Sequence, residues 1–513
     1  MAASTIRGIG GWRLVPLAAA LTLAGISADT LASIPLSAPV PTAWKPGDGR
    51  AVAALFAALD AVAHTRAPAP PHAAASLAVN SCADDGGSGT LRGVIAAAGE
   101  GDSVDLSGLT CSVITLTHGA IPILLDDLTI VGAGADKLAI DGAGLDRVLA
   151  HYGYGTLDLQ GVTVRDGVSH VTGYHVTGGA CIVSNGYVTM HHSAISGCVA
   201  SGEGVYGGGI VARGIALYTS TLSGNVALGS HPNTFTAAYG GGAMAYRGPV
   251  YLYASTVSGN RATHTLSDTH GSYCTGGGIF SDLGGYAYAS TFDSNYSYGT
   301  GGGIASHAGF GISDSTISGN HAKHKTGGGV FARVFDSMLI NNSTIADNTA
   351  GSSGGGIYFI GVRDSLTLQS SIVAENKAAG TPADIATLDA FTIAGANNLV
   401  IAAAVNVSLP TDTVHGDPKL LPLGDYGGPT RTHALMVGSP GLDAGNNLTG
   451  LISDQRGPGF ARVLGAATDI GAFEGALAPA PVVPAPGLSL RLAALLAALL
   501  GGLGWCSLRR RGA

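Results

Sequence analysis

The stretch STISGNHA, residues 315–322, places a serine and a histidine three positions apart. A serine nucleophile activated by a histidine base is the pairing that cleaves esters, so Ser318 and His321 are the first candidates for chemistry. The tripeptide Gly101–Ser103 offers a second serine of this kind. Both are short strings of letters, and such a motif carries weight only when the surrounding structure puts its residues in their roles.

The phrase around Ser318 recurs along the chain, with steps of about 25 to 36 residues. Each copy contains the same landmark position, which is occupied by Cys198 and then by Asn225, Asn260, Asn295, Asn320, Asn348 and Asn376. A glycine triplet recurs with it and starts at Gly207, Gly240, Gly276, Gly301, Gly327 and Gly354. Self-similarity at this period is typical of a solenoid. We therefore interpret Ser318 and His321 as turn residues and not as a catalytic pair.

Two apolar columns run through the repeat. The column three positions before the landmark holds Ile195, Leu222, Val257, Phe292, Ile317, Ile345 and Val373. The column eight positions before it holds Met190, Leu217, Leu252, Ala287, Ile312, Ile340 and Leu368. Short alternating runs bounded by Gly and Asn are typical of strands, and no helical period is present.

These columns predict an all-β fold, a right-handed parallel β-helix over residues 76–400. Its coils must stack because no coil can bury its apolar columns alone. We expect the asparagines to form a ladder of turn residues with left-handed backbone, joined by side-chain hydrogen bonds. The glycine triplets are expected at tight corners with positive φ.

The 513-residue chain has a net charge of -8, and 11% of its residues are charged. It has no basic stripe, which argues against a nucleic-acid partner. The cysteines form no CxxC pair, and the paired loop histidines His264/His270 and His321/His324 lack partners at ligand spacing, so we predict neither a metal site nor a cofactor.

The two ends of the chain predict export. Residues 1–32 combine two arginines, an apolar run and small residues, as in a secretory signal peptide, with a retained membrane anchor as the alternative. Residues 33–75 are an Ala/Pro-rich linker in which we expect a short helix at 51–64. A Pro-rich spacer, 476–487, precedes an apolar tail, 488–513, that ends in Arg509–Arg511. Such a tail implies export and sorting machinery as partners, and contact with the membrane, either transient or as a permanent anchor.

The chain has six cysteines, and disulfides are permitted in an exported protein. We predict the pairs Cys82–Cys111, near the first coil, and Cys181–Cys198, within one coil. Cys506 lies in the tail. Cys274 is left over, and the sequence alone does not fix the connectivity.

Two blocks outside the coils carry a family resemblance. The first is VNSCADDGGSGTLRGVIAAAGEGDSVDLSGL, which resembles the opening coils of bacterial CSLREA-associated β-helix proteins, although GTLRGV stands where that hexapeptide would be. The second is GDPKLLPLGDYGGPTRTHALMVGSPGLDAGN followed by SDQRG and TDIGAFE, which is similar to the choice-of-anchor Q module. The end of the chain resembles a PEP-CTERM-like sorting tail. The resemblance implies an exported β-helix of the cell envelope, and it implies no catalytic residues.

The second block breaks the coil period and is dense in Gly, Pro and Asp. We interpret residues 401–475 as a capping module, because an open solenoid leaves unpaired backbone groups at its end. The module is also rich in acids, together with one histidine. We interpret these residues as capping groups of turns and not as an acid–base cluster: Asp417, His433, Asp443, Asp454, Asp469 and Glu474.

Many parallel β-helices are polysaccharide lyases or hydrolases, whose chemistry needs clustered carboxylates with basic partners. Here the acids of the coils fall in different slots of the repeat: Asp282, Asp293, Asp314, Asp336, Asp347 and Asp364. The arginines Arg213, Arg247, Arg333 and Arg363 are equally scattered. No catalytic residues are predicted, and a lyase-type enzyme is kept as the alternative to a binding protein.

One outward column supplies the candidate site. Seven positions before the landmark stand His191, Tyr218, Tyr253 and Tyr288, on successive coils whose strands lie about 4.8 Å apart. An exposed aromatic strip suits sugar rings, while a self-stacked ladder that merely covers the sheet is the alternative. The longest insertions, 226–239 and 261–275, belong to the same coils and favour binding. The predicted function is adhesion or polysaccharide binding by surface display, and a rigid spacer without a ligand is a third hypothesis.

Overall fold

The computed structural model describes residues 38–39, 73–171, 175–230, 236–265, 273–334, 338–361, 366–380 and 384–478. The predicted signal peptide, the linker with its helix at 51–64, the Pro-rich spacer and the apolar tail lie almost wholly outside these ranges. In the part that is described, no helix is long and apolar enough to cross a bilayer.

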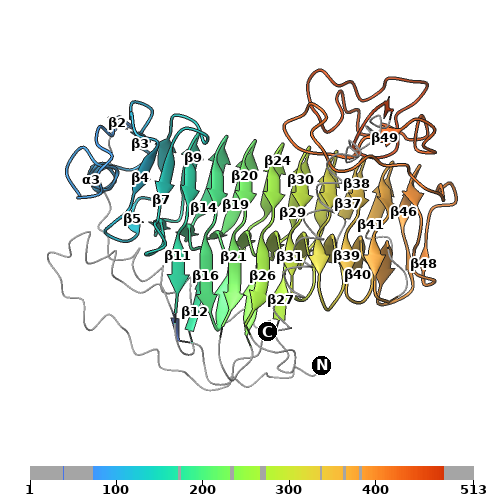
Figure 1. Ribbon diagram of the computed structural model, residues 1–513, viewed down its shortest axis with the longest axis horizontal. Coiled ribbons are helices and arrows are strands. Elements are labelled where there is room, and N and C mark those ends of the chain that lie inside the picture. The colour runs from blue at the N-terminus through green and yellow to red at the C-terminus, as the bar shows by residue number, and fades with distance from the viewer. Residues whose placement is uncertain are drawn as a thin grey trace, which may run out of the picture. The chain divides into compact units, whose positions relative to one another are not determined.

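The described strands form a right-handed parallel β-helix, as predicted (Figure 1). Strands of successive coils pair in parallel and in register, so that each coil contributes one strand to each of several long sheets. The twelve-stranded sheet contains, in order of pairing, β2 (Ser76–Ala78), β3 (Ser103–Asp105), β6 (Leu128–Val131), β9 (Thr156–Gln160), β14 (Tyr187–His191), β19 (Gly214–Tyr218), β24 (Val250–Tyr253), β29 (Gly285–Tyr288), β33 (Phe310–Ser313), β37 (Met338–Asn341), β41 (Leu366–Gln369) and β46 (Ala394–Ala396).

The next strand of each coil belongs to the eleven-stranded sheet, made of β4 (Val113–Thr115), β7 (Ala139–Asp141), β10 (Thr163–Arg165), β15 (Ala194–Ser196), β20 (Thr221–Ser223), β25 (Thr256–Ser258), β30 (Thr291–Asp293), β34 (Thr316–Ser318), β38 (Thr344–Ala346), β42 (Ile372–Ala374) and β47 (Leu399–Val400). The eight-stranded sheet follows, with β11 (Val168–His170), β16 (Val199–Gly202), β21 (Val226–Gly229), β26 (Arg261–His264), β31 (Tyr296–Ser297), β35 (His321–Ala322), β39 (Thr349–Ala350) and β43 (Lys377–Ala378).

Two further sheets complete the coils. The five-stranded sheet contains β1 (Ala38–Pro39), β12 (His175–Gly178), β17 (Gly204–Tyr206), β22 (Ala237–Tyr239) and β27 (Tyr273–Thr275). The ten-stranded sheet contains β5 (Ile121–Ile123), β8 (Leu149–His151), β13 (Ile182–Ser184), β18 (Ile210–Ala212), β23 (Ala243–Ala245), β28 (Ile279–Ser281), β32 (Ile304–Ser306), β36 (Val330–Val334), β40 (Ile357–Gly361) and β44 (Ile385–Thr387). Near the C-terminal end, β45 (Phe391–Thr392) pairs with β48 (Val407–Ser408), and β49 (Leu435–Met436) and β50 (Ala476–Leu477) follow.

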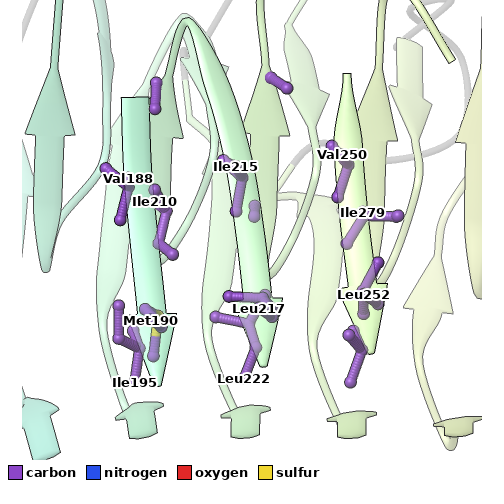
Figure 2. Packing of buried hydrophobic residues seen from close by; sticks show 14 of the residues in the cluster. Val188, Met190, Ile195, Ile210, Ile215, Leu217, Leu222, Val250, Leu252 and Ile279 are labelled. Atoms are coloured by element: carbon purple, nitrogen blue, oxygen red, sulfur yellow. The ribbon is translucent and has the colours of Figure 1, made fainter. Parts of the chain in front are cut away.

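Both predicted apolar columns point into the solenoid. Met190 and Ile195 are fully buried, and the columns continue from coil to coil through Leu217 and Leu222 (Figure 2). Side chains of the ten-stranded sheet, such as Ile210, meet them from the opposite wall (Figure 2). The fold therefore follows from the repeat: each coil contributes a layer of aliphatic side chains that only the next coil can cover. The helix α3 (Leu91–Ala97) buries Leu91, Val94 and Ile95 at the first coils.

The corners of each coil require left-handed backbone at defined positions. The first glycine of every triplet has positive φ, as predicted, for example 63° at Gly240. The asparagines of the ladder do not themselves have left-handed backbone, which differs from the prediction. The left-handed residue is the one before each asparagine, such as Gly259 with φ of 64°. A further left-handed corner precedes it by five residues, at Ala254 for example. Small or polar residues occupy these corners, where a bulkier side chain would clash with the left-handed backbone.

The asparagines themselves form one continuous buried ladder. The side-chain carbonyl of Asn295 accepts the backbone N–H and the side-chain amide of Asn260, both at 3.0 Å. Asn295 in turn donates both groups to the side-chain carbonyl of Asn320, at 3.0 and 2.9 Å. The ladder ends on Asp384, whose Oδ1 accepts the backbone N–H and the side-chain amide of Asn376. Because every rung satisfies buried backbone groups, the ladder fixes the spacing of the coils.

A second ladder runs beside it, and the sequence did not predict it. In each rung a serine hydroxyl donates to the carbonyl two residues earlier and accepts an N–H from the preceding coil. Ser255 Oγ, for example, donates to Tyr253 O at 2.9 Å and accepts from Ser220 N at 3.1 Å. The members are Ser193, Ser220, Ser255, Ser290, Ser315, Ser343 and Ser371, followed by Asn398.

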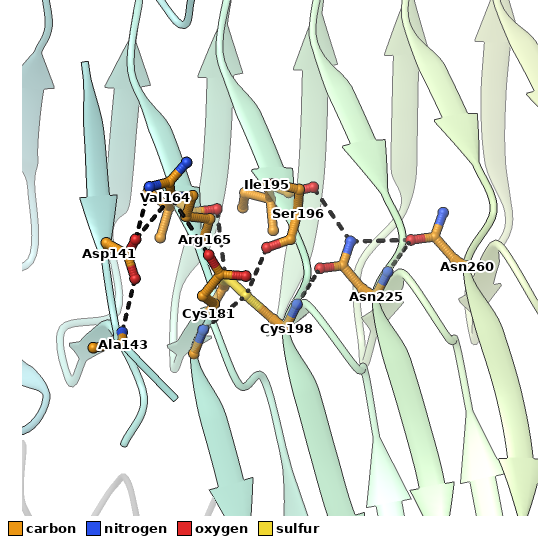
Figure 3. Close-up of a disulfide and its surroundings, with 12 residues drawn as sticks. Asp141, Ala143, Val164, Arg165, Cys181, Ile195, Ser196, Cys198, Asn225 and Asn260 are labelled. Atoms are coloured by element: carbon orange, nitrogen blue, oxygen red, sulfur yellow. Dashed lines mark hydrogen bonds and ion pairs between the residues drawn. A yellow bond between two sulfur atoms is a disulfide. The ribbon is translucent and has the colours of Figure 1, made fainter. Parts of the chain in front are cut away.

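The disulfides Cys82–Cys111 and Cys181–Cys198 are present as predicted, and Cys274 is free and buried. Cys198 occupies the landmark slot, and its N–H donates to the side-chain carbonyl of Asn225 (Figure 3). Cys181 occupies the slot of the third glycine of the triplet. In a later coil a Cβ on that glycine, Gly209, would lie 2.9 Å from the side chain of Asn225. The coil that holds Cys181 and Cys198 therefore replaces a paired glycine and asparagine with a pair of cysteines.

This equivalence makes a prediction. The double variant Cys181→Gly/Cys198→Asn is expected to be more stable than Cys181→Ala/Cys198→Ala by about 1–3 kcal/mol. The amide would extend the ladder by one rung and offer an acceptor to the N–H of Gly167, which now lies 3.4 Å from Cys198 Sγ. Urea unfolding of both variants, with the remaining cysteines in the same redox state, measures the difference. Equal stability of the two variants would contradict the slot equivalence.

Candidate ligand-binding site

The predicted strip lies on the outer face of the twelve-stranded sheet. The rings of His191 and Tyr218 are stacked with centroids 4.7 Å apart, and those of Tyr218 and Tyr253 are 5.1 Å apart, with almost parallel planes. Tyr288 continues the column in register on β29. The stacking covers both faces of Tyr218, so this ring presents its edge and hydroxyl outward. Burial, and then the neighbouring Tyr218, raise the pKa of Tyr253.

Three further tyrosines lie along one side of the strip, toward the starts of the same strands, and the sequence did not predict them. Tyr187 and Tyr251 are 42% and 40% exposed, which leaves much of each ring open to a ligand. Tyr187 leans over the next strand, where a Cβ on Gly214 would lie 2.7 Å from the ring. Tyr286 leans in the same way over Gly311, at 2.6 Å. A glycine in register on the next coil was the signal that could have identified Tyr187 and Tyr286, whereas Tyr251 faces Tyr286 itself.

We call these seven residues the tyrosine face: Tyr187, His191, Tyr218, Tyr251, Tyr253, Tyr286 and Tyr288. It contains rings of two kinds. In the column, the rings of His191, Tyr218 and Tyr253 stack on and stabilise one another. The flanking rings lie over glycines or are largely exposed, and they offer apolar surface to a ligand.

The C-terminal module bounds the tyrosine face at one end. The hydroxyl of Tyr288 is hydrogen-bonded to Ser453, and burial raises the pKa of Tyr288. The same column is buried on the next three coils, where it holds Ser313, Asn341 and Gln369. The amide of Asn341 donates to Thr449 of the module at 3.0 Å. The exposed part of the column therefore ends at the C-terminal module, and a polymer bound along the strip would contact the module at that end.

The module is attached to the outside of the coils by polar contacts. Gln455 Nε2 lies 3.0 Å from Thr291 Oγ1, and Thr316 Oγ1 lies 2.8 Å from Thr432 Oγ1. The guanidinium of Arg431 lies 2.6 Å from Asp293 at the edge of the module. In Figure 1 the module lies beside strands β37 and β38.

A buried ionic cluster stabilises this attachment. Arg462 is fully buried, donates to the carbonyls of Asp469 and Gly471 at 2.8 Å, and lies 3.3 Å from Asp314 of the coils. Burial raises the pKa of Asp314 to about 7, with Arg462 opposing the rise. Burial likewise raises the pKa of Glu474 to about 7.

Two of the other acids cap turns, as interpreted from the sequence: Asp417 accepts the N–H of Lys419 at 2.7 Å, and Asp454 accepts the N–H of Arg456 at 2.9 Å. Asp454 and Asp469 also make long-range contacts, to the N–H of Glu474 at 2.8 Å and the N–H of Asp443 at 2.7 Å. Asp454 further pairs with the guanidinium of Arg456 at 2.6 Å. These carboxylates therefore join distant segments of the module as well as capping its turns.

Ser318 does contact a histidine, but that residue is His433 of the module and not His321. The Nδ1–H of His433 donates to Leu421 O at 2.8 Å, so its Nε2 accepts from the Ser318 hydroxyl, also at 2.8 Å. Burial lowers the pKa of His433 and keeps the ring neutral. Both side chains are buried, with no path for a substrate, and they therefore join the module to the coils.

The carboxylates of the coils are not gathered around the tyrosine face. Asp293 and Asp314 pair with arginines of the module, and Asp282 lies 3.1 Å from His307 beside the ten-stranded sheet. Asp158 lies 3.7 Å from His191 at one end of the strip. Asp336 and Asp364 lie outside the described residues. Among the described residues no group of His, Cys, Asp and Glu could hold a metal ion.

The two long insertions are placed differently from the expectation. Their described ends belong to β21 and β26 of the eight-stranded sheet and to β22 and β27 of the five-stranded sheet. The tyrosine face belongs to the twelve-stranded sheet. Adjacency in sequence therefore did not place the insertions beside the strip, because each coil turns through other sheets before the insertion begins.

No family model matches the chain, so its resemblance to the choice-of-anchor Q module remains a prediction. No curated protein matches its sequence. Among solved structures, the crystal structure of pectate lyase Pel9A aligns over 79% of this chain and 97% of its own, with a TM-score of 0.44 and 12% identity.

Proposed function

We propose that the chain is an exported β-helix protein of the cell envelope that binds a polysaccharide on its tyrosine face and does not cleave it. The exposed rings of Tyr187 and Tyr251 carry the proposal, and the half-buried Tyr286 extends them along the same side of the stacked column. They offer apolar surface to the C–H faces of sugar rings. The column beside them adds hydroxyl groups at the spacing of the coils.

The surroundings of the face favour binding over catalysis. A lyase or glycosidase needs a base or a pair of carboxylates placed at the reacting sugar. Asp158 stands at one end of the strip, and Asp293 is engaged by Arg431 at the other. A polysaccharide lying along Tyr218 and Tyr253 would meet rings and hydroxyl groups.

Export and display complete the proposal. Two disulfides agree with folding in an oxidising compartment. The signal peptide proposed at 1–32 would direct export, and the tail proposed at 488–513 would be held in the membrane before sorting. The C-terminal module, which resembles choice-of-anchor Q, would then stand between the solenoid and the surface anchor.

The test is a glycan array probed with the purified protein and with two variants. Tyr187→Ala/Tyr251→Ala removes exposed rings and is expected to weaken binding about tenfold. Tyr218→Ala/Tyr253→Ala/Tyr288→Ala removes the strip itself and is expected to abolish binding. Tyr358→Ala is the matched control, because Tyr358 forms a similar outward stack with Phe331 on the ten-stranded sheet.

The outcomes separate the hypotheses. Unchanged binding in both tyrosine variants would place the ligand elsewhere and refute the proposed site. Absence of binding to every glycan would favour a rigid spacer. Release of shortened sugars during the incubation would instead indicate the lyase-type enzyme.

A further inference from the structure

The outer face of the eight-stranded sheet carries a different surface, which the proposed function does not use. Three cations lie over three tyrosine rings there. Arg261 is 4.5 Å from the ring centroid of Tyr296, and Lys323 is 5.0 Å from that of Tyr298. Lys325 is 4.6 Å from the centroid of Tyr273, on the adjoining five-stranded sheet. We call these six residues, together with His321, the basic patch.

The strand register makes the patch continuous. Arg261, Tyr296 and His321 stand opposite one another on β26, β31 and β35. The rings of Tyr296 and His321 contact each other edge to face at 5.6 Å. Strands of adjacent coils lie about 4.8 Å apart, so the patch presents cations and rings on successive coils.

The charge of this surface contrasts with that of the whole chain. The protein has a net charge of -8, yet the eight strands of this sheet contain no aspartate or glutamate. The segment 321–334, which supplies Lys323 and Lys325, is also free of acids. Burial, and then the charges of Lys323 and His324, lower the pKa of His321, in keeping with a positive environment.

Cations held over aromatic rings suit one kind of ligand in particular. Lysine and arginine attract carboxylate or sulfate groups, and a ring beneath each cation fixes its position. An acidic polysaccharide presents such groups at regular intervals along its chain. A nucleic acid also carries anions, but its bases need open aromatic faces on which to stack, and Arg261 and His321 stand on either side of the Tyr296 ring.

We infer that the basic patch is a second binding site, separate from the tyrosine face, and that it takes a linear acidic polysaccharide. The sugar acids would lie across the coils of the eight-stranded sheet, with their carboxylates at Arg261, Lys323 and Lys325, whose positions the tyrosine rings fix. The protein would then hold two glycan segments on two of its sheets.

The test measures binding of polyglucuronate, with the same polymer after carboxyl reduction as the neutral probe. Lys323→Gln/Lys325→Gln is expected to weaken polyglucuronate binding by about five- to tenfold, and 0.5 M salt is expected to weaken it further. The control variant Lys137→Gln/Arg247→Gln removes two positive charges that lie outside the patch. It should bind polyglucuronate as tightly as the unaltered protein does. The neutral polymer should bind more weakly than the acidic one.

Failure of this inference is distinguishable from failure of the proposed function. Polyglucuronate binding should survive Tyr187→Ala/Tyr251→Ala, which alters only the tyrosine face. Equal losses in the two charge variants would show a non-specific effect and overturn the inference. Tighter binding of single-stranded DNA than of polyglucuronate would overturn it in favour of a nucleic-acid ligand.

Discussion

Replacing Asn295 with alanine is expected to lower the free energy of unfolding by about 3 kcal/mol or more. The change leaves three buried groups without partners: the N–H and one side-chain amide hydrogen of Asn260, and the carbonyl of Val257, which accepts from Asn295 Nδ2 at 2.8 Å. Each unsatisfied buried polar group costs about 1–3 kcal/mol. No water can replace the amide without opening the coils, because Asn260 and Asn295 are almost wholly buried.

Urea and thermal unfolding of Asn295→Ala measure this effect. The matched control is Asn406→Ala, which removes a single hydrogen bond to Asp389 O near the surface and should cost about 1 kcal/mol or less. If Asn295→Ala loses no more unfolding free energy than the control does, the asparagine ladder is a consequence of the coil spacing and not its cause.

The repeat made much of the fold predictable from the sequence. Buried columns such as those of Leu222 and Leu252 recur at fixed offsets from the asparagine, and burial forces a stack of parallel coils. Cys181 and Cys198 could be paired because their spacing fits one coil. The serine ladder was missed because serine is as common on exposed strands as on buried ones, so its periodicity alone did not signal burial.

The periodicity of the sequence did not predict where the module packs on the coils. Arg462 reaches Asp314 across 148 residues of sequence, and neither residue belongs to a conspicuous motif. The same contacts bury Ser313, Asn341 and Gln369, and they thereby determine where the tyrosine face ends. The extent of the candidate site therefore depends on long-range packing, whereas the identity of its central tyrosines could be predicted from the repeat.

The buried position of Arg462 leads to the second large prediction. Arg462→Met is expected to destabilise the attachment of the module by about 3–5 kcal/mol at pH 8, because it leaves the carboxylates of Asp314 and Glu474 buried without their cation. The loss should be smaller at pH 5. A carboxyl with a raised pKa binds its proton more tightly in the folded protein than in the unfolded chain. Its protonation therefore favours folding at acidic pH, and that contribution is lost as the pH rises from about 4 towards the folded value of about 7.

Removing the guanidinium raises the pKa of Asp314 further, since the charge of Arg462 opposes the effect of burial there. The pKa of Glu474 rises less, because hydrogen bonds from the backbone N–H groups of Asp469 and Leu464 oppose burial more strongly than Arg462 does. The variant should therefore depend on pH more steeply than the unaltered protein, and adding Asp314→Asn to it should restore stability at pH 8. Arg165→Met is the control, because Arg165 forms a partly exposed pair with Asp141 that is worth about 1 kcal/mol or less. Limited proteolysis of the module and thermal unfolding at pH 5 and pH 8 provide the measurements. A loss for Arg462→Met that matches the control, or that is equal at both pH values, would show that apolar packing and neutral hydrogen bonds attach the module without the ionic cluster.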